Sequence, residues 1–100
     1  MREFCLNLVC PLPMEEELLD VLLESDGVEV FTSVQINSFG MGIKRLSVQE
    51  QVLGRSRSLQ VQALLDEVVM NRLIKRIGER FAGAGVRYWV TPVAFEGEIK

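Results

Sequence analysis

The sequence predicts an α+β fold in which four strands and two helices follow in the order strand, helix, strand, strand, helix, strand. Three observations lead to this prediction. Apolar residues alternate with period two in four segments, two other segments carry helical apolar stripes, and proline or glycine punctuates most junctions. The 100 residues are 48% hydrophobic and 25% charged, an ordinary globular composition, so we expect one domain over residues 1–100.

The first half of the chain predicts a strand, a helix and a second strand. Residues 3–10 alternate with period two and end at Pro11. Residues 14–24 carry a leucine-rich stripe, and Glu15–Glu17 lie in the first turn, where the helix dipole favours negative charge. Residues 28–38 predict the second strand. Its apolar side is Val28, Val30, Val34 and Ile36.

The second half predicts a strand, a helix and a last strand. Residues 58–65 alternate, and Asp66 can cap the helix that follows. The core-facing side of this helix is Met70, Leu73, Ile74, Ile77 and Phe81. Gly83 and Gly85 end the helix, and residues 86–92 form the fourth strand. Residues 94–100 then form a tail that adds a short edge or contacts another subunit.

With right-handed crossovers, this order gives a ferredoxin-like βαββαβ fold, a four-stranded antiparallel sheet with both helices on one face. We expect the uncovered face to show Cys5, Val9, Phe31, Leu64 and Trp89 among Asn7, Ser33, Gln35 and Gln60. A face so rich in large apolar groups is unusual on a small monomer. An oligomer that packs the open faces together is therefore expected.

The second and third strands are separated by a long connection, residues 37–57. Connections of this length are usually functional or disordered, and we expect residues 42–54 to be poorly ordered without a partner. The connection contains one acid, Glu50, in a chain of net charge −3. Its basic residues are Lys44, Arg45, Arg55 and Arg57. This cationic segment on an acidic protein suggests a contact surface for an anion or a partner.

Charge and composition exclude several functions. The chain has no histidine, and its two cysteines, Cys5 and Cys10, lack metal-binding or redox spacing. No nucleophile elbow or phosphate-binding P-loop occurs, so we expect neither an enzyme nor a metal site. Overall acidity argues against nonspecific nucleic-acid binding. The sequence contains no apolar run of membrane-spanning length and no export signal, which predicts a cytoplasmic protein without membrane insertion.

Two glycine pairs predict a ligand site. Gly40 and Gly42 open the long connection, and Gly83 and Gly85 precede the last strand. Such glycines serve turns and helix caps, or let backbone N–H groups converge on an anion. In a ferredoxin-like oligomer, the connection of one subunit can meet the turn of its neighbour. The candidate ligand-binding residues are Gly40, Gly42, Lys44, Arg45, Gly83, Gly85 and Arg87.

These features resemble the PII-like superfamily of trimeric signalling proteins. The segment 36–42 is similar to the G-F-G entry to the flexible T-loop of PII proteins. Gly83-Ala84-Gly85 is similar to the G-x-G of their B-loop, and residues 90–93 to the end of the strand after it. The chain looks like a small uncharacterised branch of about 100 residues, often found beside heavy-metal efflux genes.

The resemblance implies a cytoplasmic homotrimer that binds a small anionic effector, such as an adenine nucleotide, between subunits. It implies that the 37–57 connection reports occupancy to a partner protein such as a membrane transporter. Several positions depart from the PII pattern. Val86 stands where PII proteins have a phosphate-binding lysine, with Arg87 one residue on, and Ser38 replaces the first T-loop glycine. The modifiable tyrosine is missing, and the arginine-rich C-loop is reduced to residues 95–100.

Two alternatives remain open. One is a metal-responsive trimer associated with heavy-metal tolerance that binds no nucleotide, like the CutA divalent-cation-tolerance proteins of related fold. The other is an ACT-type small-molecule regulatory module. An RNA-recognition domain shares the element order, but Asn7, Gln60 and Gln62 stand where its stacking aromatics are needed.

Overall fold

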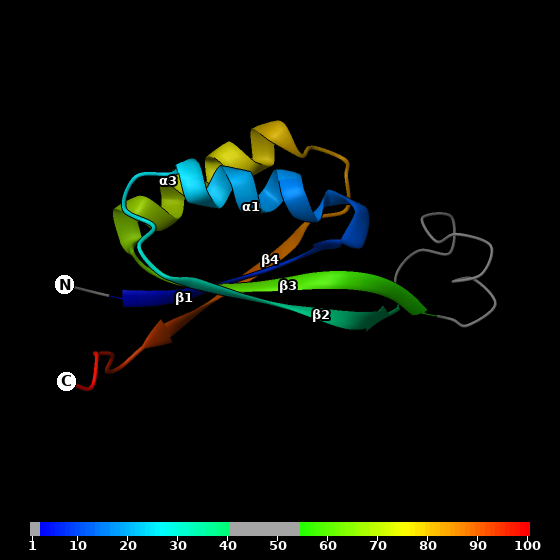
Figure 1. The fold of residues 1–100 in the computed structure, drawn as a ribbon. Helices are drawn as coiled ribbons and strands as arrows, with labels where there is room; N and C mark the ends of the chain where they lie inside the picture. Colours follow the sequence, from blue (N-terminus) through cyan, green and yellow to red (C-terminus); the bar gives the residue numbers. More distant parts are fainter. Residues whose placement is uncertain (1–2, 41–54) are drawn as a thin grey trace.

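A computed structural model describes residues 3–40 and 55–100 of the chain (Figure 1). The elements in order are β1 (Glu3–Pro11), the 3₁₀ turn η1 (Leu12–Met14), α1 (Glu15–Glu24), β2 (Phe31–Phe39), β3 (Arg55–Asp66), α3 (Glu67–Arg80) and β4 (Arg87–Val93). Residues 41–54, between β2 and β3, lie outside the described residues. The predicted order of four strands and two helices is confirmed.

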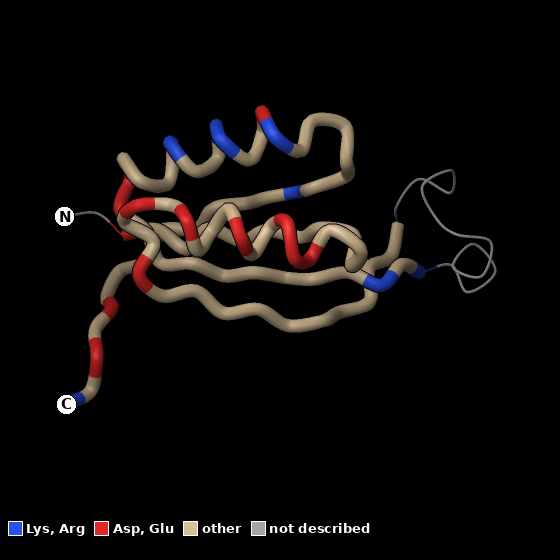
Figure 2. The backbone as a smooth tube through the Cα atoms, turned by 45° about the horizontal axis from the view of Figure 1, so that its top comes forward, with Lys and Arg blue, Asp and Glu red and all other residues tan. Residues whose placement is uncertain are grey.

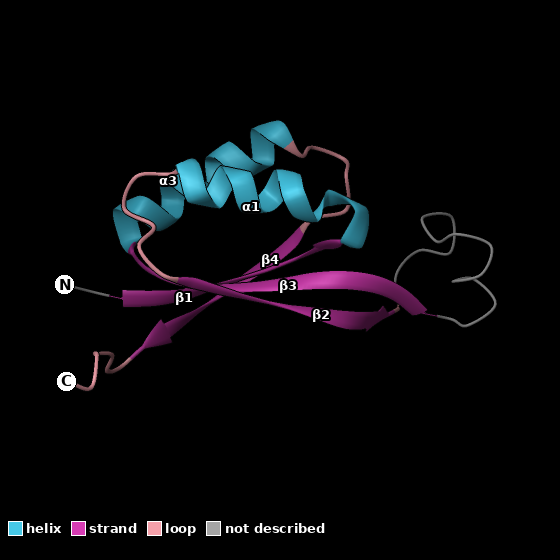
Figure 3. Cartoon of the chain, viewed as in Figure 1, coloured by secondary structure: helices cyan, strands magenta, loops and turns pink. Residues whose placement is uncertain are grey.

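The strands form one antiparallel sheet in the order β2-β3-β1-β4. Both helices cover the same face of this sheet, and the opposite face is uncovered in the described chain (Figures 1 and 3). This arrangement is the predicted ferredoxin-like βαββαβ fold. β1 and β3 are the inner strands, while β2 and β4 are the sheet's edges.

The core lies between the sheet and the two helices. Leu6 lies opposite Ala63 and Leu8 lies opposite Val61, and all four side chains are buried. Alternate residues of β1 and β3 therefore face the helices. The buried apolar residues are Leu6, Leu8, Cys10, Leu18, Val21, Leu22, Leu59, Val61, Ala63, Leu65, Met70, Leu73, Ile77 and Phe81. The stripe predicted for α3 is confirmed: Ile74 packs against this core, and the other four residues are buried, namely Met70, Leu73, Ile77 and Phe81.

Several boundaries differ from the prediction. β2 begins at Phe31 rather than at residue 28, and Val28 instead packs against the core from the connection after α1. β3 begins at Arg55, so Arg55 and Arg57 belong to a strand and not to the long connection. β2 and β3 stay paired as far as Phe39 and Arg55, because their backbone N–H and C=O groups hydrogen-bond to each other there.

The predicted faces of β2 are wrong. Residues directly opposite one another in antiparallel strands share a face, and Phe31 lies opposite the buried Ala63. Phe31 therefore lies on the helix side with Ser33 and Gln35, whereas Val34, opposite Gln60, lies on the open face. The strand has apolar residues on both sides, so alternation alone could not distinguish its two faces.

Two local features position α3. The carboxylate of Asp66 caps the helix, accepting a hydrogen bond from the Val69 N–H at 2.9 Å, as predicted. Gly27 approaches the same turn so closely that an added Cβ would lie 2.6 Å from Cγ2 of Val69. Gly27 also has a φ of 85°, which favours glycine. The connection after α1 is thus tightly packed against the start of α3.

Candidate functional site

The predicted site residues fall into two groups at one end of the sheet. Gly40 directly follows β2, with a φ of 78°. Gly83 and Gly85 form the turn between α3 and β4, and Arg87 is the first residue of β4. The other candidates, Gly42, Lys44 and Arg45, lie outside the described residues.

The Gly83–Gly85 turn reverses the chain after α3. The helix ends with a hydrogen bond from the Phe81 N–H to the Ile77 carbonyl at 2.9 Å, and the Ala84 N–H then donates to the Phe81 carbonyl at 3.0 Å. Gly83 and Gly85 have φ values of 75° and 88°, in the left-handed region that residues with a side chain rarely occupy. The geometry of this turn is sufficient to explain both glycines.

One chain does not bring the two groups together. Gly40 follows the edge strand β2, and Arg87 begins the opposite edge strand β4. Three strand spacings of about 4.8 Å separate these edges, roughly 14 Å in all. Both groups lie toward the end of the sheet where β1 and β2 finish and β3 and β4 begin (Figure 1). Arg87 is level with Val34, because both pair through Val9 and Gln60, and Gly40 follows Val34 by six residues, about 20 Å further along the strands. A site that uses both therefore needs a second copy of the chain.

Arg87 and the turn also face different sides of β4. Arg87 pairs with Val9 and Trp89 with Asn7, which places both on the open face. Tyr88, between them, pairs with the buried Leu8 and lies on the helix side. Arg87 is exposed, so its guanidinium is available to a ligand or subunit at the open face rather than beneath α3.

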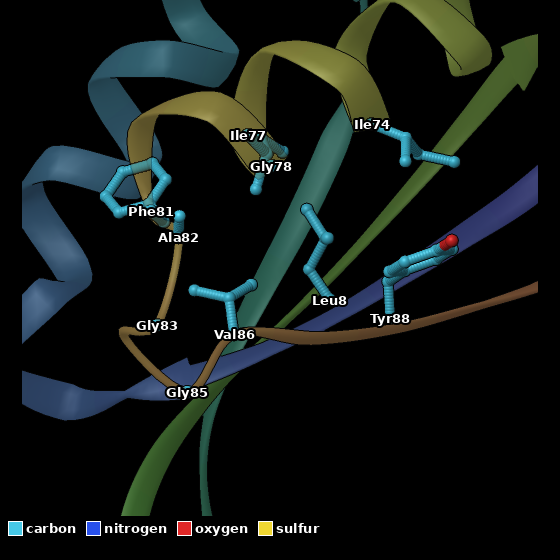
Figure 4. A pocket seen from close by; sticks show the side chains of 10 residues that line it. All are labelled: Leu8, Ile74, Ile77, Gly78, Phe81, Ala82, Gly83, Gly85, Val86 and Tyr88. Carbon is cyan, nitrogen blue, oxygen red and sulfur yellow. The ribbon is translucent and has the colours of Figure 1, made fainter.

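An apolar pocket of about 350 Å³ opens beside the turn, between α3 and β4 (Figure 4). Leu8 points toward the helix from β1, and Val86 points toward it from the residue before β4. Ile74 and Tyr88 lie together at one end. The lining residues are Leu8, Ile74, Ile77, Gly78, Phe81, Ala82, Gly83, Gly85, Val86 and Tyr88. The sequence prediction missed this pocket. Its available signal was Gly78, which interrupts the α3 apolar stripe with a residue that has no side chain.

A smaller, polar pocket of about 230 Å³ lies near the end of β2. Asn37 pairs with Arg57 across β2 and β3, so the arginine is positioned by a strand. The lining residues are Leu12, Gln35, Ile36, Asn37, Arg57 and Ser58. Its amide and guanidinium groups lie close to the point where the chain enters the long connection, and they extend the candidate site beyond the predicted residues.

Charges are segregated between the helices. Acidic residues lie along α1, and most of the charged residues along α3 are basic (Figure 2). Two basic side chains of α3 contact other residues of the same chain. Arg76 forms an ion pair with Glu24 at 3.2 Å and donates to Ser25 Oγ at 3.0 Å, while Arg72 donates to the Asp26 carbonyl at 2.9 Å. These contacts tie the end of α1 to α3, so they favour a structural role for the two arginines.

The cysteines are not arranged for chemistry. Both are free; Cys10 is buried and Cys5 half-buried. Burial, with a smaller contribution from the charge of Glu15, raises the pKa of the Cys10 thiol to about 11. A thiol of this kind is a poor nucleophile and a poor metal ligand at neutral pH. Within residues 3–40 and 55–100, no three or more His, Cys, Asp or Glu side chains group into a metal site.

The open face of the sheet carries large apolar side chains. Val34 is 55% exposed, Trp89 46% and Leu64 45%. Among them lies a polar pair, Asn7 and Gln62, on the two inner strands. The predicted open face is confirmed for Cys5, Val9, Leu64 and Trp89. Val34 lies on this face, whereas Phe31 does not. Neither described helix has the length and apolar character needed to cross a bilayer.

Comparison with known proteins gives a family and a fold. The family described as "Protein of unknown function (DUF3240)" matches residues 1–100. A crystal structure of a DUF3240 family protein from Shewanella baltica OS155 superimposes with a TM-score of 0.80 at 16% identity, covering 98% of this chain and 97% of that one. No curated protein matches the chain.

The other similar structures include a nitrogen regulatory PII-like protein. CPII, a PII-like protein from Thiomonas intermedia K12 bound to ADP, AMP and bicarbonate, has a TM-score of 0.75 at 16% identity, covering 99% of this chain and 98% of that one. GlnK from B. subtilis has a TM-score of 0.68 at 14% identity, covering 94% and 87%. At these identities the likeness establishes the fold and leaves the ligand to be argued from the site.

Proposed function

The chain belongs to the DUF3240 family and shares the fold of PII-like proteins, and we propose that it is a noncatalytic cytoplasmic regulator that binds a small anionic effector between the subunits of a homotrimer. The observation that carries this proposal is the separation of the candidate site residues. Gly40 and Arg87 lie at opposite edges of the sheet and are offset by six residues along the strands, so that in this proposal different copies supply the two halves of a site.

The open face supports self-association. Trp89, Leu64 and Val34 are each about half exposed on a sheet face that no described helix covers. Packing such faces against one another removes apolar surface from water, and each large side chain contributes about 1.5–3 kcal/mol when fully buried. A ring of three copies brings the β2 edge of one near the β4 edge of the next.

The chemistry of the two halves suits an anion. Arg87 supplies an exposed guanidinium on the open face, two residues after Gly85. The other half has Gly40, three residues after Asn37, which lines the polar pocket together with Arg57. Guanidinium groups bind phosphate and carboxylate through paired hydrogen bonds. Adenine nucleotides are the first candidates because the similar CPII was crystallised with ADP, AMP and bicarbonate.

The long connection is the proposed output of the regulator. It leaves the sheet directly after Gly40, next to the proposed site, and Lys44 and Arg45 add to its positive charge. An effector that binds these cations changes the surface offered to a partner protein, such as a membrane transporter. The change requires that the effector prefer one state of the connection, since equal affinity for both states would shift nothing.

Isothermal titration calorimetry of the full chain with ADP, AMP, ATP and bicarbonate tests the proposal. We expect at least one of these anions to bind, and Arg87→Ala to weaken binding by about tenfold, the scale of one lost charge-assisted contact. Arg72→Ala is the control, because it removes the same charge from an arginine that contacts Asp26. Equal affinity in wild type and Arg87→Ala would remove Arg87 from the site, and no anion binding would reject the proposal.

The same titration with divalent metal ions tests the metal-responsive alternative. Tight metal binding without anion binding would favour it. Since no three His, Cys, Asp or Glu side chains group together in the described residues, the metal ligands would have to come from elsewhere in the chain or from more than one copy.

A further inference from the structure

The tail, residues 94–100, extends away from the folded body (Figure 1). It carries Phe95, which is 94% exposed, and Ile99, which is 98% exposed; these are the most exposed of the large hydrophobic residues in the described chain. We propose that Phe95 of one copy inserts into the apolar pocket between α3 and β4 of a second copy. The tail would thus connect neighbouring subunits.

The pocket suits an apolar side chain. Its volume of about 350 Å³ is near the small end of the range for ligand pockets, about 300–1,000 Å³. Its walls are aliphatic and aromatic, and Gly78 leaves an opening in the helix wall that an ordinary residue would fill (Figure 4). An aromatic ring gains from burial here without leaving a polar atom unpaired.

Phe95 cannot fill the pocket of its own chain while β4 stays in the sheet. Val93 is held opposite Glu3, and Tyr88, at the pocket, lies five residues back along the strand. Five strand residues span about 16 Å. Phe95 follows Val93 by only two residues, which reach about 7 Å when fully extended. The aromatic ring therefore needs the pocket of another copy.

Charge and backbone both favour this occupant. The tail carries Glu96 and Glu98, and Lys75 lies about one turn before Gly78 on α3. In the described sheet β4 is an edge, so its outer backbone groups can pair with an added extended segment. Tail into pocket is a head-to-tail contact, which closes into a ring when the rotation between copies allows it.

This inference requires self-association but no effector, so the two proposals can fail separately. Sedimentation equilibrium of the full chain over a range of concentrations measures the association of subunits. Phe95→Asp removes the inserted ring, and Gly78→Leu fills the pocket from the helix. Gly78 tolerates the change because an added Cβ meets nothing within 4 Å and leucine favours a helix.

Each variant is expected to weaken association by about tenfold or more, as for a buried interface anchor. The double variant should be no weaker than either single one, because both remove the same contact. Leu23→Asp is the control: it removes a hydrophobic residue that is 71% exposed on α1, and association should be unchanged. Gly78→Ala leaves most of the pocket open and should also associate normally. Circular dichroism checks that each variant is folded.

Mixing the two single variants tests whether the tail of one copy enters the pocket of another. Phe95→Asp keeps its pocket and Gly78→Leu keeps its tail, so the mixture should associate more tightly than either variant alone. Unchanged dissociation constants in both variants, additive losses in the double variant or no gain on mixing would each overturn the inference. If the wild-type chain binds no anion but these results hold, the effector proposal fails and the tail contact stands.

Discussion

The side-chain amide of Gln62 donates a hydrogen bond to Oδ1 of Asn7 at 2.9 Å, joining β3 to β1 in the middle of the open face. Asn7 is only 4% exposed although no helix covers this side of the sheet. The pair is a fixed polar contact within an otherwise largely apolar surface.

Loss of this contact should destabilise the protein. Gln62→Ala leaves the buried Asn7 oxygen without its partner, and we expect the free energy of unfolding to fall by about 1–2 kcal/mol. Urea denaturation at a fixed protein concentration measures it, since association also affects apparent stability. Gln60→Ala, on the same face of β3, is the matched control and should cost less. Equal losses in the two variants would mean that the hydrogen bond contributes nothing.

Charge on the open face should separate the subunits. In Trp89→Glu, a carboxylate replaces an indole that is about half exposed on this face, and burying it against another copy is unfavourable. Light scattering is expected to give the mass of a monomer for this variant and of a trimer for the wild type. Val68→Glu places the same charge on an exposed residue of α3 and should stay trimeric. A wild-type monomer at micromolar concentration would refute the assembly.

Gly27 should tolerate no side chain. Gly27→Ala combines a left-handed backbone with a Cβ 2.6 Å from Cγ2 of Val69, and we expect a loss of about 1–3 kcal/mol. Thermal unfolding compares it with Gly97→Ala, where an added Cβ meets nothing within 4 Å. If both variants have the same melting temperature, the close approach of Gly27 to α3 is not important for stability.

Cys10 should make stability depend on pH in alkaline solution. Its thiol has a pKa of about 11 in the folded chain against 9.0 for an exposed thiol, so the folded state holds the proton more tightly. The stabilisation is complete below pH 9 and is lost as the pH rises from about 9 to 11. Denaturation curves across this range should show a fall that Cys10→Ala reduces. The same slope in both proteins would assign the fall to other groups.

The sequence predicted the inner part of the fold better than its edges. β1 and β3 are covered by helices on one side only, so their alternation identifies the buried residues, such as Leu6 and Val61. β2 is an edge strand with Phe31 on one side and Val34 on the other, and its pattern left the two faces ambiguous. Pairing with β3, a contact distant in sequence, decides between them.

The candidate site was predicted in its components but not in its arrangement. The glycine turn at Gly83 and Gly85 follows from local backbone requirements, and the sequence shows it directly. The apolar pocket depends on how α3 lies over β4, with Gly78 between apolar neighbours. Such a space is a property of packing between distant segments, which helical periodicity does not report.

The continued pairing of β2 with β3, as far as Phe39 opposite Arg55, has a consequence for variation of this protein. β1 pairs with β3 only from Ser58 onward, so the described sheet ends in a ribbon of two strands that carries both ends of the long connection. Since this ribbon already holds the ends together, doubling the length of the connection costs only about 0.6 kcal/mol in closure entropy. The length or sequence of this segment can therefore change while the same sheet and helices continue to fold.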